Sequence, residues 1–161
     1  ILWGLYFAIH YVSYFATSVI GLSFHQSINI LIILNGVGVI GRTLPNILAD
    51  HLFGPLNTLI FFTICSAILS LCWISIVDER GLYTWAILYG IMGAAVQSLY
   101  PASLINLDND LNMVGTRMGV MFTVISFTAL TGPPIAGMLI HKNSGNFLHA
   151  QIFSGLNILV G

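Results

Sequence analysis

The long stretches without charge limit what this chain can fold into more than any other feature of its sequence. A helix that crosses the hydrocarbon core of a bilayer needs about 20 mostly apolar residues. Windows of about this length or longer recur along the chain, and Lys, Arg, Asp and Glu are absent from residues 1–41, 51–77, 81–107, 118–141 and 143–161. The pattern therefore predicts several membrane-spanning helices.

The composition excludes the common classes of water-soluble protein. Four Lys and Arg plus five Asp and Glu make nine charges in 161 residues, so 6% of the chain is charged and 57% is hydrophobic. A typical soluble domain has about 25% charged residues. The net charge of −1 offers no basic excess for nucleic acid. We expect no soluble enzyme, no nucleic-acid partner and no disordered chain, but a multi-pass integral membrane protein in contact with the lipid bilayer.

The first window is too long for one helix and has to be divided. Residues 24–29 read Phe-His-Gln-Ser-Ile-Asn, a polar interruption suited to a turn. Dividing the window there predicts an all-α membrane protein, a six-helix transmembrane bundle with spans near residues 2–22, 28–48, 56–77, 83–105, 118–140 and 147–161, the last of them truncated. Asp, Asn and Gly mark the expected connections at residues 50–55, 78–81, 106–115 and 141–146. Six helices of about 20 residues use about 120 positions, so we expect one domain over residues 1–161.

Patterns that can mark an enzyme have a structural explanation here. Residues 36–41 match G-x-G-x-x-G, but they lie inside an apolar run and Asp50 follows too closely for a dinucleotide site. We interpret these glycines as small residues that let two membrane helices approach closely. The cysteines Cys65 and Cys72 fit no zinc spacing and are interpreted as buried thiols. No nucleophile or metal motif is present, so we expect no catalytic residue, no metal, no cofactor and no enzymatic activity.

Arg42 is the first candidate for a binding residue. It would lie six residues before the end of the second span at Leu48, about 9 Å inside along the helix axis. A guanidinium group at that depth must reach the lipid headgroups, pair with an anion or face a wet cavity. Two interpretations stay open, a helix-end anchor and a contact to an anionic substrate.

Polar residues within the other spans are further candidates for lining an aqueous path. Tyr6 and His10 share one face of the first span, and Asn35 lies in the second. In the fourth span, Gln97 and Tyr100 lie beside a proline that favours a kink near a cavity. Hydrogen bonds between neighbouring helices are the alternative role for His10 and Asn35.

The fifth span contains two adjacent prolines, which interrupt its pattern. The segment comprises Gly132, Pro133, Pro134, Ile135, Ala136 and Gly137. Neighbouring groups can satisfy the backbone of a proline-containing helix in a membrane bundle. Kinked helices of this kind suit a protein that alternates between two conformations, although static bundles contain them too.

Two segments carry a resemblance to a known family. Residues 41–55 read Gly-Arg-Thr-Leu-Pro-Asn-Ile-Leu-Ala-Asp-His-Leu-Phe-Gly-Pro, and residues 132–137 are followed by Ser-Gly-Asn-Phe at 144–147. With these segments the chain resembles the C-terminal half, helices seven to twelve, of a major facilitator superfamily transporter. It is most similar to the monocarboxylate-porter family in its fungal branch, and the likeness covers essentially the whole chain.

The resemblance implies a function and a set of site residues. It implies half of a 12-helix fold that works with a missing N-terminal six-helix half at the plasma membrane. The transport it implies is secondary-active or facilitative movement of a small organic solute, a monocarboxylate-like anion, by alternating access. Arg42 would bind the substrate carboxylate, with Tyr6, His10, Asn35, Gln97 and Tyr100 around it. Conformational change would involve Gly41, Asp50, Gly54, Gly132, Pro133, Pro134 and Gly137.

Departures from the family pattern limit what can be carried over. Gly38 stands one turn before Arg42, where mammalian members carry a proton-coupling aspartate. Every carboxylate of this chain lies in an expected loop. We therefore expect weak or absent proton coupling through this half, unless His10 or the missing half supplies it. The alternative to a transporter half is a truncated, non-transporting membrane protein fragment or assembly subunit.

Overall fold

The computed structural model describes residues 1–106, 113–142 and 147–160. Within these residues the chain forms six α-helices and no strand. The helices are α1 (Leu2–Ser18), α2 (Phe24–Leu48), α3 (Pro55–Cys72), α4 (Glu79–Asn106), α5 (Val114–Lys142) and α6 (Leu148–Val160). The expected all-α architecture with six helices is confirmed. Most of the expected connections at 106–115 and 141–146 lies outside the described residues.

Four of the helices are long and apolar enough to cross a membrane, namely α2, α3, α4 and α5. Helix α1 has 17 residues and α6 has 13, which is shorter than the roughly 20 residues that a full crossing needs. Six spans were expected, with only the last one short. The structure therefore confirms the number of helices, while membrane length is reached by four of them.

The boundary between α1 and α2 differs from the expected one. Residues 24–27 were expected in a turn, but they form the first turn of α2. The reason is a capping box, in which the Ser23 hydroxyl accepts from the Gln26 backbone N–H at 3.4 Å and the Gln26 Oε1 accepts from the Ser23 N–H at 3.0 Å. The chain reverses just before this cap, where Gly21 has a φ of 78°.

Two other expected loops are partly helical. A π-helical turn, Ala49–Phe53, continues α2 beyond Leu48 and ends at Gly54. Glu79 begins α4 and accepts a hydrogen bond from the Gln26 side chain at 3.2 Å. An acidic residue in the first turn is stabilised by the partial positive charge at the helix N-terminus. This favourable charge explains why α4 begins before the expected span.

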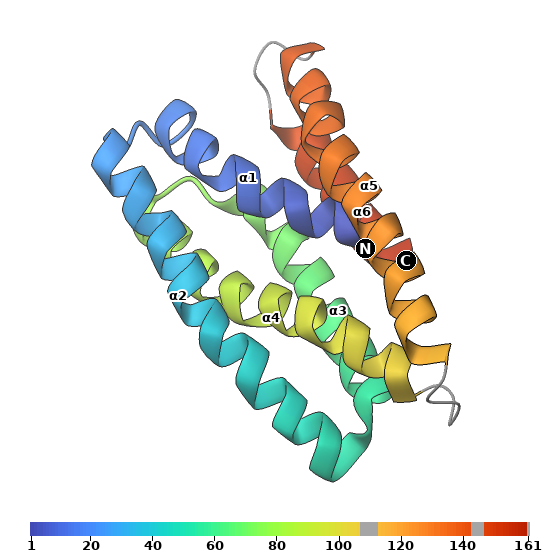
Figure 1. Ribbon diagram of the computed structural model, residues 1–161. Coiled ribbons are helices and arrows are strands. Elements are labelled where there is room, and N and C mark those ends of the chain that lie inside the picture. The colour runs from blue at the N-terminus through green and yellow to red at the C-terminus, as the bar shows by residue number, and fades with distance from the viewer. Residues whose placement is uncertain (107–112, 143–146, 161) are drawn as a thin grey trace.

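The helices pack in an order that differs from their order in the chain. Helix α2 packs most extensively on α4, and α4 also contacts α3. Helix α3 in turn packs on α6. Figure 1 shows α1 crossing between α2 and the pair formed by α5 and α6, all of which it contacts. Helices α1, α2 and α4 are therefore mutual neighbours.

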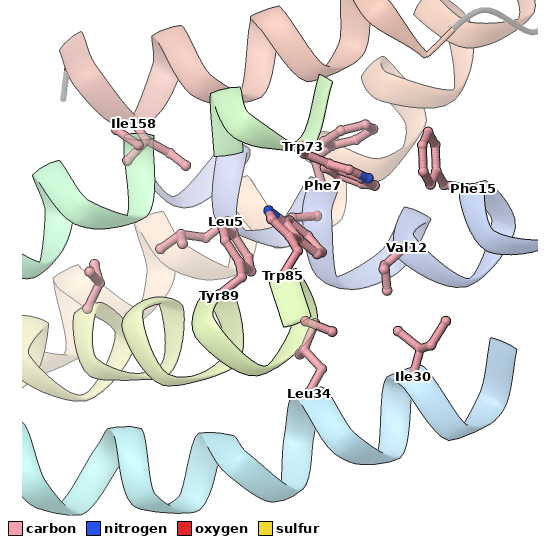
Figure 2. Packing of buried hydrophobic residues seen from close by; sticks show 14 of the residues in the cluster. Leu5, Phe7, Val12, Phe15, Ile30, Leu34, Trp73, Trp85, Tyr89 and Ile158 are labelled. Atoms are coloured by element: carbon pink, nitrogen blue, oxygen red, sulfur yellow. The ribbon is translucent and has the colours of Figure 1, made fainter. Parts of the chain in front are cut away.

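An aromatic cluster holds α1, the end of α3 and α4 together (Figure 2). Trp73 lies in a short 3₁₀ turn, Trp73–Ser75, that follows α3. Its ring stacks on Trp85 at 4.7 Å between centroids and contacts Phe7 at 5.4 Å and Phe15 at 5.3 Å. Trp85 also donates from its indole N–H to the Leu69 carbonyl at 2.7 Å. These contacts order the core around large side chains that are almost fully buried.

Glycines allow α2 and α4 to approach each other closely. A Cβ atom added to Gly41 would lie 2.7 Å from the Cα of Ile91, and one added to Gly90 would lie 2.6 Å from the Leu34 carbonyl oxygen. Gly38 also faces α4, whereas Gly36 has no neighbour within 4 Å. The interpretation of residues 36–41 as a helix-packing segment is confirmed for Gly38 and Gly41. The part of Gly41 in conformational change stays a prediction beside this packing role.

Large apolar side chains cover much of the outer surface. Helix α5 is the least buried of the four membrane-length helices, and its exposed large apolar residues include Val120, Phe122, Val124, Phe127, Leu130 and Met138. Lipid tails solvate such side chains, so these surfaces suit a bilayer. Cys72 belongs to an outward face with Ile64 and Ile68, and it is exposed. The expectation of a buried thiol is therefore wrong for Cys72, while Cys65 is partly buried.

Candidate functional site

A small cavity between α2 and α4 brings three of the predicted binding residues together. Arg42 and Asn35 from α2 and Gln97 from α4 all line it. The other lining residues are Ile9, Leu34, Gly38, Tyr89, Gly90, Gly93 and Ala94. Its volume of about 20 Å³ is enough for one water molecule or one atom group of similar size. The cavity can therefore hold a single polar group of a solute, with the rest of the solute outside.

The cavity exists because small residues leave space where α2 meets α4. Gly93 has no side chain, and a Cβ there would lie 3.4 Å from Leu5 Cδ2 and 3.6 Å from Tyr89 Cε1. A Cβ at Gly38 would lie 3.4 Å from that of Ala94. Larger side chains at these positions would fill the space, so the glycines shape the cavity as well as the helix contact.

Arg42 lies deeper in the helical rod than the sequence predicts. The π-helical turn continues the rod to Phe53, eleven residues beyond Arg42, whereas the expected end was Leu48. Its backbone carbonyl accepts from Asn46 Nδ2 at 2.7 Å. The guanidinium group is exposed, and no residue of the described part of the chain forms a hydrogen bond or ion pair with it. Both predicted roles of Arg42, a helix-end anchor and a contact to an anionic substrate, stay predictions.

The two amides at the cavity come from facing helices. Asn35 lies seven residues before Arg42, which is two helical turns along the same face of α2. Its Nδ2 donates to the Leu31 carbonyl at 2.9 Å within the same helix. This bond leaves the Asn35 Oδ1 free, so the alternative role, a hydrogen bond between helices, stays a prediction. Gln97 reaches the same cavity from α4, so the two amides and the guanidinium flank one small space.

Tyr6 and His10 lie together on α1 but do not line this cavity. The His10 Nδ1–H donates to the Tyr6 carbonyl at 2.8 Å, and the two rings are 6.2 Å apart between centroids. His10 is exposed, and its Nδ1 bond lies within α1, so the alternative of a bond between helices through Nε2 stays a prediction. Helix α1 contributes Ile9 to the cavity. Tyr6 and His10 are therefore on one face of α1, one turn apart, as predicted.

Tyr100 belongs to a different place in the fold. It lines a cavity of about 420 Å³ with residues of α3 and α6, among them Leu59, Thr63 and Ile158. Tyr100 lines a space toward α3 and α6, whereas Gln97, three residues earlier in α4, lines the cavity toward α2. The structure therefore does not bring Tyr100 to the Arg42 cavity, and its predicted role there lacks structural support.

The segment with two prolines stays helical, because α5 runs through it without interruption. Prolines at 133 and 134 cannot donate to the carbonyls of Ala129 and Leu130 one turn earlier. Helix α1 forms two hydrogen bonds with this part of α5. The Tyr11 hydroxyl donates to the Pro133 carbonyl at 2.9 Å, and Trp3 Nε1 donates to Thr131 Oγ1 at 3.1 Å. The span expected through the two prolines is therefore present as a continuous helix, and the part of Gly132, Pro133, Pro134 and Gly137 in conformational change stays a prediction.

Asp50 and Gly54 occupy the reversal between α2 and α3. Asp50 is exposed within the π-helical turn. Gly54 has a φ of 77°, which favours glycine, and its carbonyl accepts from the Thr58 hydroxyl at 2.8 Å. Neither residue lines the Arg42 cavity, and their gating role stays a prediction.

Tyr89 is the cavity residue that sequence reasoning missed. It is 1% exposed, and its hydroxyl has no partner among the described residues. In sequence it is one aromatic residue among many in an apolar run, and no polar neighbour marks it. Only the packing of α4 against α1 and α2 reveals it. No group of three or more His, Cys, Asp or Glu residues in the described part of the chain could hold a metal ion.

Comparison with known proteins places the chain beside fungal transporters. It is 41% identical, over 99% of its length, to an MFS-type transporter of Gibberella zeae, and that match covers 36% of the relative. It is 31% identical over 98% of its length to the MFS-type transporter dbaD of Emericella nidulans, covering 35% of it. The aspyridones efflux protein apdF of the same fungus is 32% identical over 88% of the chain, covering 28% of that relative.

The chain is similar to one part of each of these transporters. MFS denotes the major facilitator superfamily, and the chain spans about a third of the length of the relatives it matches. The relatives are transporters and not enzymes, which agrees with the expected absence of enzymatic activity. No protein-family model matches the chain. No solved structure matches it either.

Proposed function

We propose that this chain is the C-terminal six-helix half of a transporter that carries a small organic solute by alternating access. The similarity to MFS-type transporters supports transport. The segments at 41–55 and 132–137 resemble those of helices eight and eleven of the monocarboxylate-porter family and support the C-terminal placement. An N-terminal six-helix half would complete the pathway. The efflux named for apdF supports a place in the plasma membrane.

The single observation that carries the proposed substrate class is the guanidinium of Arg42, which has no partner among the described residues. It lies deep in a membrane-length helix, beside the amides of Asn35 and Gln97. A planar guanidinium group binds a carboxylate with two parallel hydrogen bonds. No acidic residue lines the cavity in the described part of the chain. The solute that fits best is a small anion with a carboxylate group, such as a monocarboxylate.

Replacement of Arg42 by alanine tests this proposal in the complete protein. Charge-assisted hydrogen bonds contribute about 1.5–3 kcal/mol, which corresponds to a rise in KM of roughly 10- to 150-fold for carboxylate solutes. The measurement is uptake and efflux of radiolabelled acetate, lactate and benzoate in a host that lacks its own carriers. Arg80→Ala is the matched control, because Arg80 is exposed in the first turn of α4.

The transport measurements also distinguish substrate binding by Arg42 from a role as a helix-end anchor. If Arg42→Ala keeps the KM of the unchanged protein, Arg42 is a helix-end anchor and the site is wrongly assigned. If the complete protein carries none of the three solutes, the proposed substrate class fails. A protein that ends where this chain ends and carries nothing would be a non-transporting fragment or assembly subunit.

We also propose that transport depends weakly, or not at all, on a proton gradient through this half. In the described part of the chain, the acidic residues lie at helix ends: Asp50 in the π-helical turn, Asp78 before α4 and Glu79 in its first turn. Gly38 is buried against α4, without a carboxylate. Uptake of radiolabelled lactate should therefore change little when a pH gradient is imposed. Strict dependence on the gradient that is lost in Arg42→Ala or Asp50→Asn would contradict this.

A further inference from the structure

We propose that Tyr11 and Trp3 of α1 are positioning residues for transport, because they hold the double-proline segment of α5 at the place where this helix can bend. This inference rests on the proposed function. The Tyr11 hydroxyl donates to the Pro133 carbonyl at 2.9 Å. Trp3 Nε1 donates to Thr131 Oγ1 at 3.1 Å. We call these two hydrogen bonds the α1–α5 clamp.

The first support is the weakness of α5 at this segment. Pro133 and Pro134 have no backbone N–H, so two carbonyls one turn earlier lose their usual donors within the helix. Sharp bends in helices occur mostly at prolines for this reason. Helix α5 is also the least buried of the four membrane-length helices, and it contacts α1 more than any other helix. The clamp is therefore a main connection between a bend in α5 and the rest of the bundle.

The second support is that glycines of the same segment make room for the clamp. A Cβ atom added to Gly137 would lie 2.6 Å from the Tyr11 hydroxyl oxygen. One added to Gly132 would lie 3.3 Å from Trp3 Cδ1, which is closer than the optimum of about 3.5–4.0 Å between carbon atoms. Because glycine has no Cβ, each aromatic side chain can approach α5 closely enough to form its hydrogen bond.

The third support is that both bonds are well prepared on the two helices. The Tyr11 ring stacks on the buried ring of Phe7, with 5.3 Å between centroids and 25° between planes. On α5, the Thr131 hydroxyl donates to the Phe127 carbonyl at 2.8 Å, which orients its oxygen as an acceptor for Trp3. Single hydrogen bonds between membrane helices are weak, so the clamp can hold α5 and still allow movement.

The contact between α1 and α5 also differs in kind from the contact between α2 and α4. The closest neighbours of an added Cβ at Gly41 or Gly90 are backbone atoms of the facing helix, which no side-chain rotation can move. At Gly137 the closest neighbour is the end of the Tyr11 side chain, which rotation about side-chain bonds can move. The α1–α5 contact is therefore the more deformable of the two.

The clamp lies outside the proposed binding site, because neither Tyr11 nor Trp3 lines the Arg42 cavity. Loss of the clamp should therefore change the rate of conformational change more than the affinity for the solute. This separation of the maximal rate from KM distinguishes a positioning residue from a binding residue.

The first test is Tyr11→Phe in the complete protein, reconstituted in liposomes, with radiolabelled acetate, lactate and benzoate as probes. Phenylalanine keeps the ring and its stacking but loses the hydroxyl. We expect the maximal rate, per amount of monodisperse protein, to fall about two- to tenfold, with KM within about twofold of the unchanged protein. Tyr14→Phe is the matched control, since Tyr14 is 52% exposed on the same helix and its hydroxyl forms no hydrogen bond with the described residues. Its maximal rate should not change.

Gly137→Ala gives a second route to the same loss. The added methyl group would displace the Tyr11 hydroxyl from the Pro133 carbonyl, so the maximal rate should fall as in Tyr11→Phe. Without the hydroxyl, the next atom of the ring, Cζ, lies 3.8 Å from the added Cβ, which is an ordinary contact. Gly137→Ala should therefore cause no further loss in the Tyr11→Phe background. Additive losses would show that the two positions act independently, and they would overturn the inference.

The remaining outcomes separate this inference from the proposed function. An unchanged or higher maximal rate in Tyr11→Phe, or a KM that rises as much as the rate falls, would overturn the clamp as a positioning element. If Arg42→Ala raises KM and Tyr11→Phe keeps the maximal rate, only this inference fails. If the complete protein carries none of the three probes, the proposed function fails and this inference fails with it.

Discussion

Replacing Gly41 by leucine is expected to separate α2 from α4 and to destabilise the protein by about 3 kcal/mol or more. An added Cβ would lie 2.7 Å from the Cα of Ile91 and still closer to its carbonyl oxygen. These are backbone atoms, so no side-chain rotation can relieve the contact. In a membrane, close packing between helices is the main source of association. The helices would have to move apart along their most extensive interface.

The consequence should extend to transport, because α2 carries Arg42 and α4 carries Gln97 and Tyr89. The measurements are reversible unfolding in mixed micelles and uptake by the complete protein. Gly36→Leu is the matched control, since Gly36 is on the same helix and has no neighbour within 4 Å. Gly90→Leu should reproduce the loss from the other side of the contact. Equal stability of the Gly41 and Gly36 variants would show that this close contact is absent.

Replacing Trp73 by alanine is expected to cost about 3–5 kcal/mol. The indole is fully buried and contacts three rings, those of Trp85, Phe7 and Phe15. Its removal would leave a large space at the point where α1, α3 and α4 meet. The measurement is again unfolding in mixed micelles, monitored by helical circular dichroism.

Two further variants define the cause of this loss. Phe61→Ala should change stability little, because Phe61 is 60% exposed and lipid or detergent surrounds it equally well after substitution. Trp73→Phe should cost less than alanine, since the indole N–H has no partner among the described residues and its loss leaves nothing unsatisfied. A Trp73→Ala variant as stable as Phe61→Ala would rule out the aromatic cluster as a stabilising element.

The helices themselves were predictable because their signal is local. Charge-free windows separated by polar turns predicted six helices, and six are present. The errors occurred at the ends, where single residues decide. Ser23 and Gln26 form a capping box, and so a polar stretch expected in a turn became the start of α2. Residues 49–53 continue that helix as a π-helical turn, which places Arg42 deeper than expected.

The candidate site was predictable only in part. Asn35 and Arg42 are two helical turns apart, so the helical period alone places them on the same face of α2. Gln97 meets them because α2 packs on α4, which the period of one helix does not reveal. Tyr100 shares the polar patch of Gln97 in sequence, yet it lines a cavity toward α3 and α6. Tyr89 had no distinguishing neighbours in sequence, and its hydroxyl became notable only through burial.

By itself, the sequence determined that lipid is the surrounding solvent, that the chain folds into helices, and that glycines at 38 and 41 offer a surface for close packing. These properties depend on residues near one another in the chain, through hydrophobicity, helical period and side-chain size. Only the tertiary structure decided which polar residues share a cavity. That choice depends on which helices are neighbours, and neighbours are set by the fit of side chains from helices far apart in sequence.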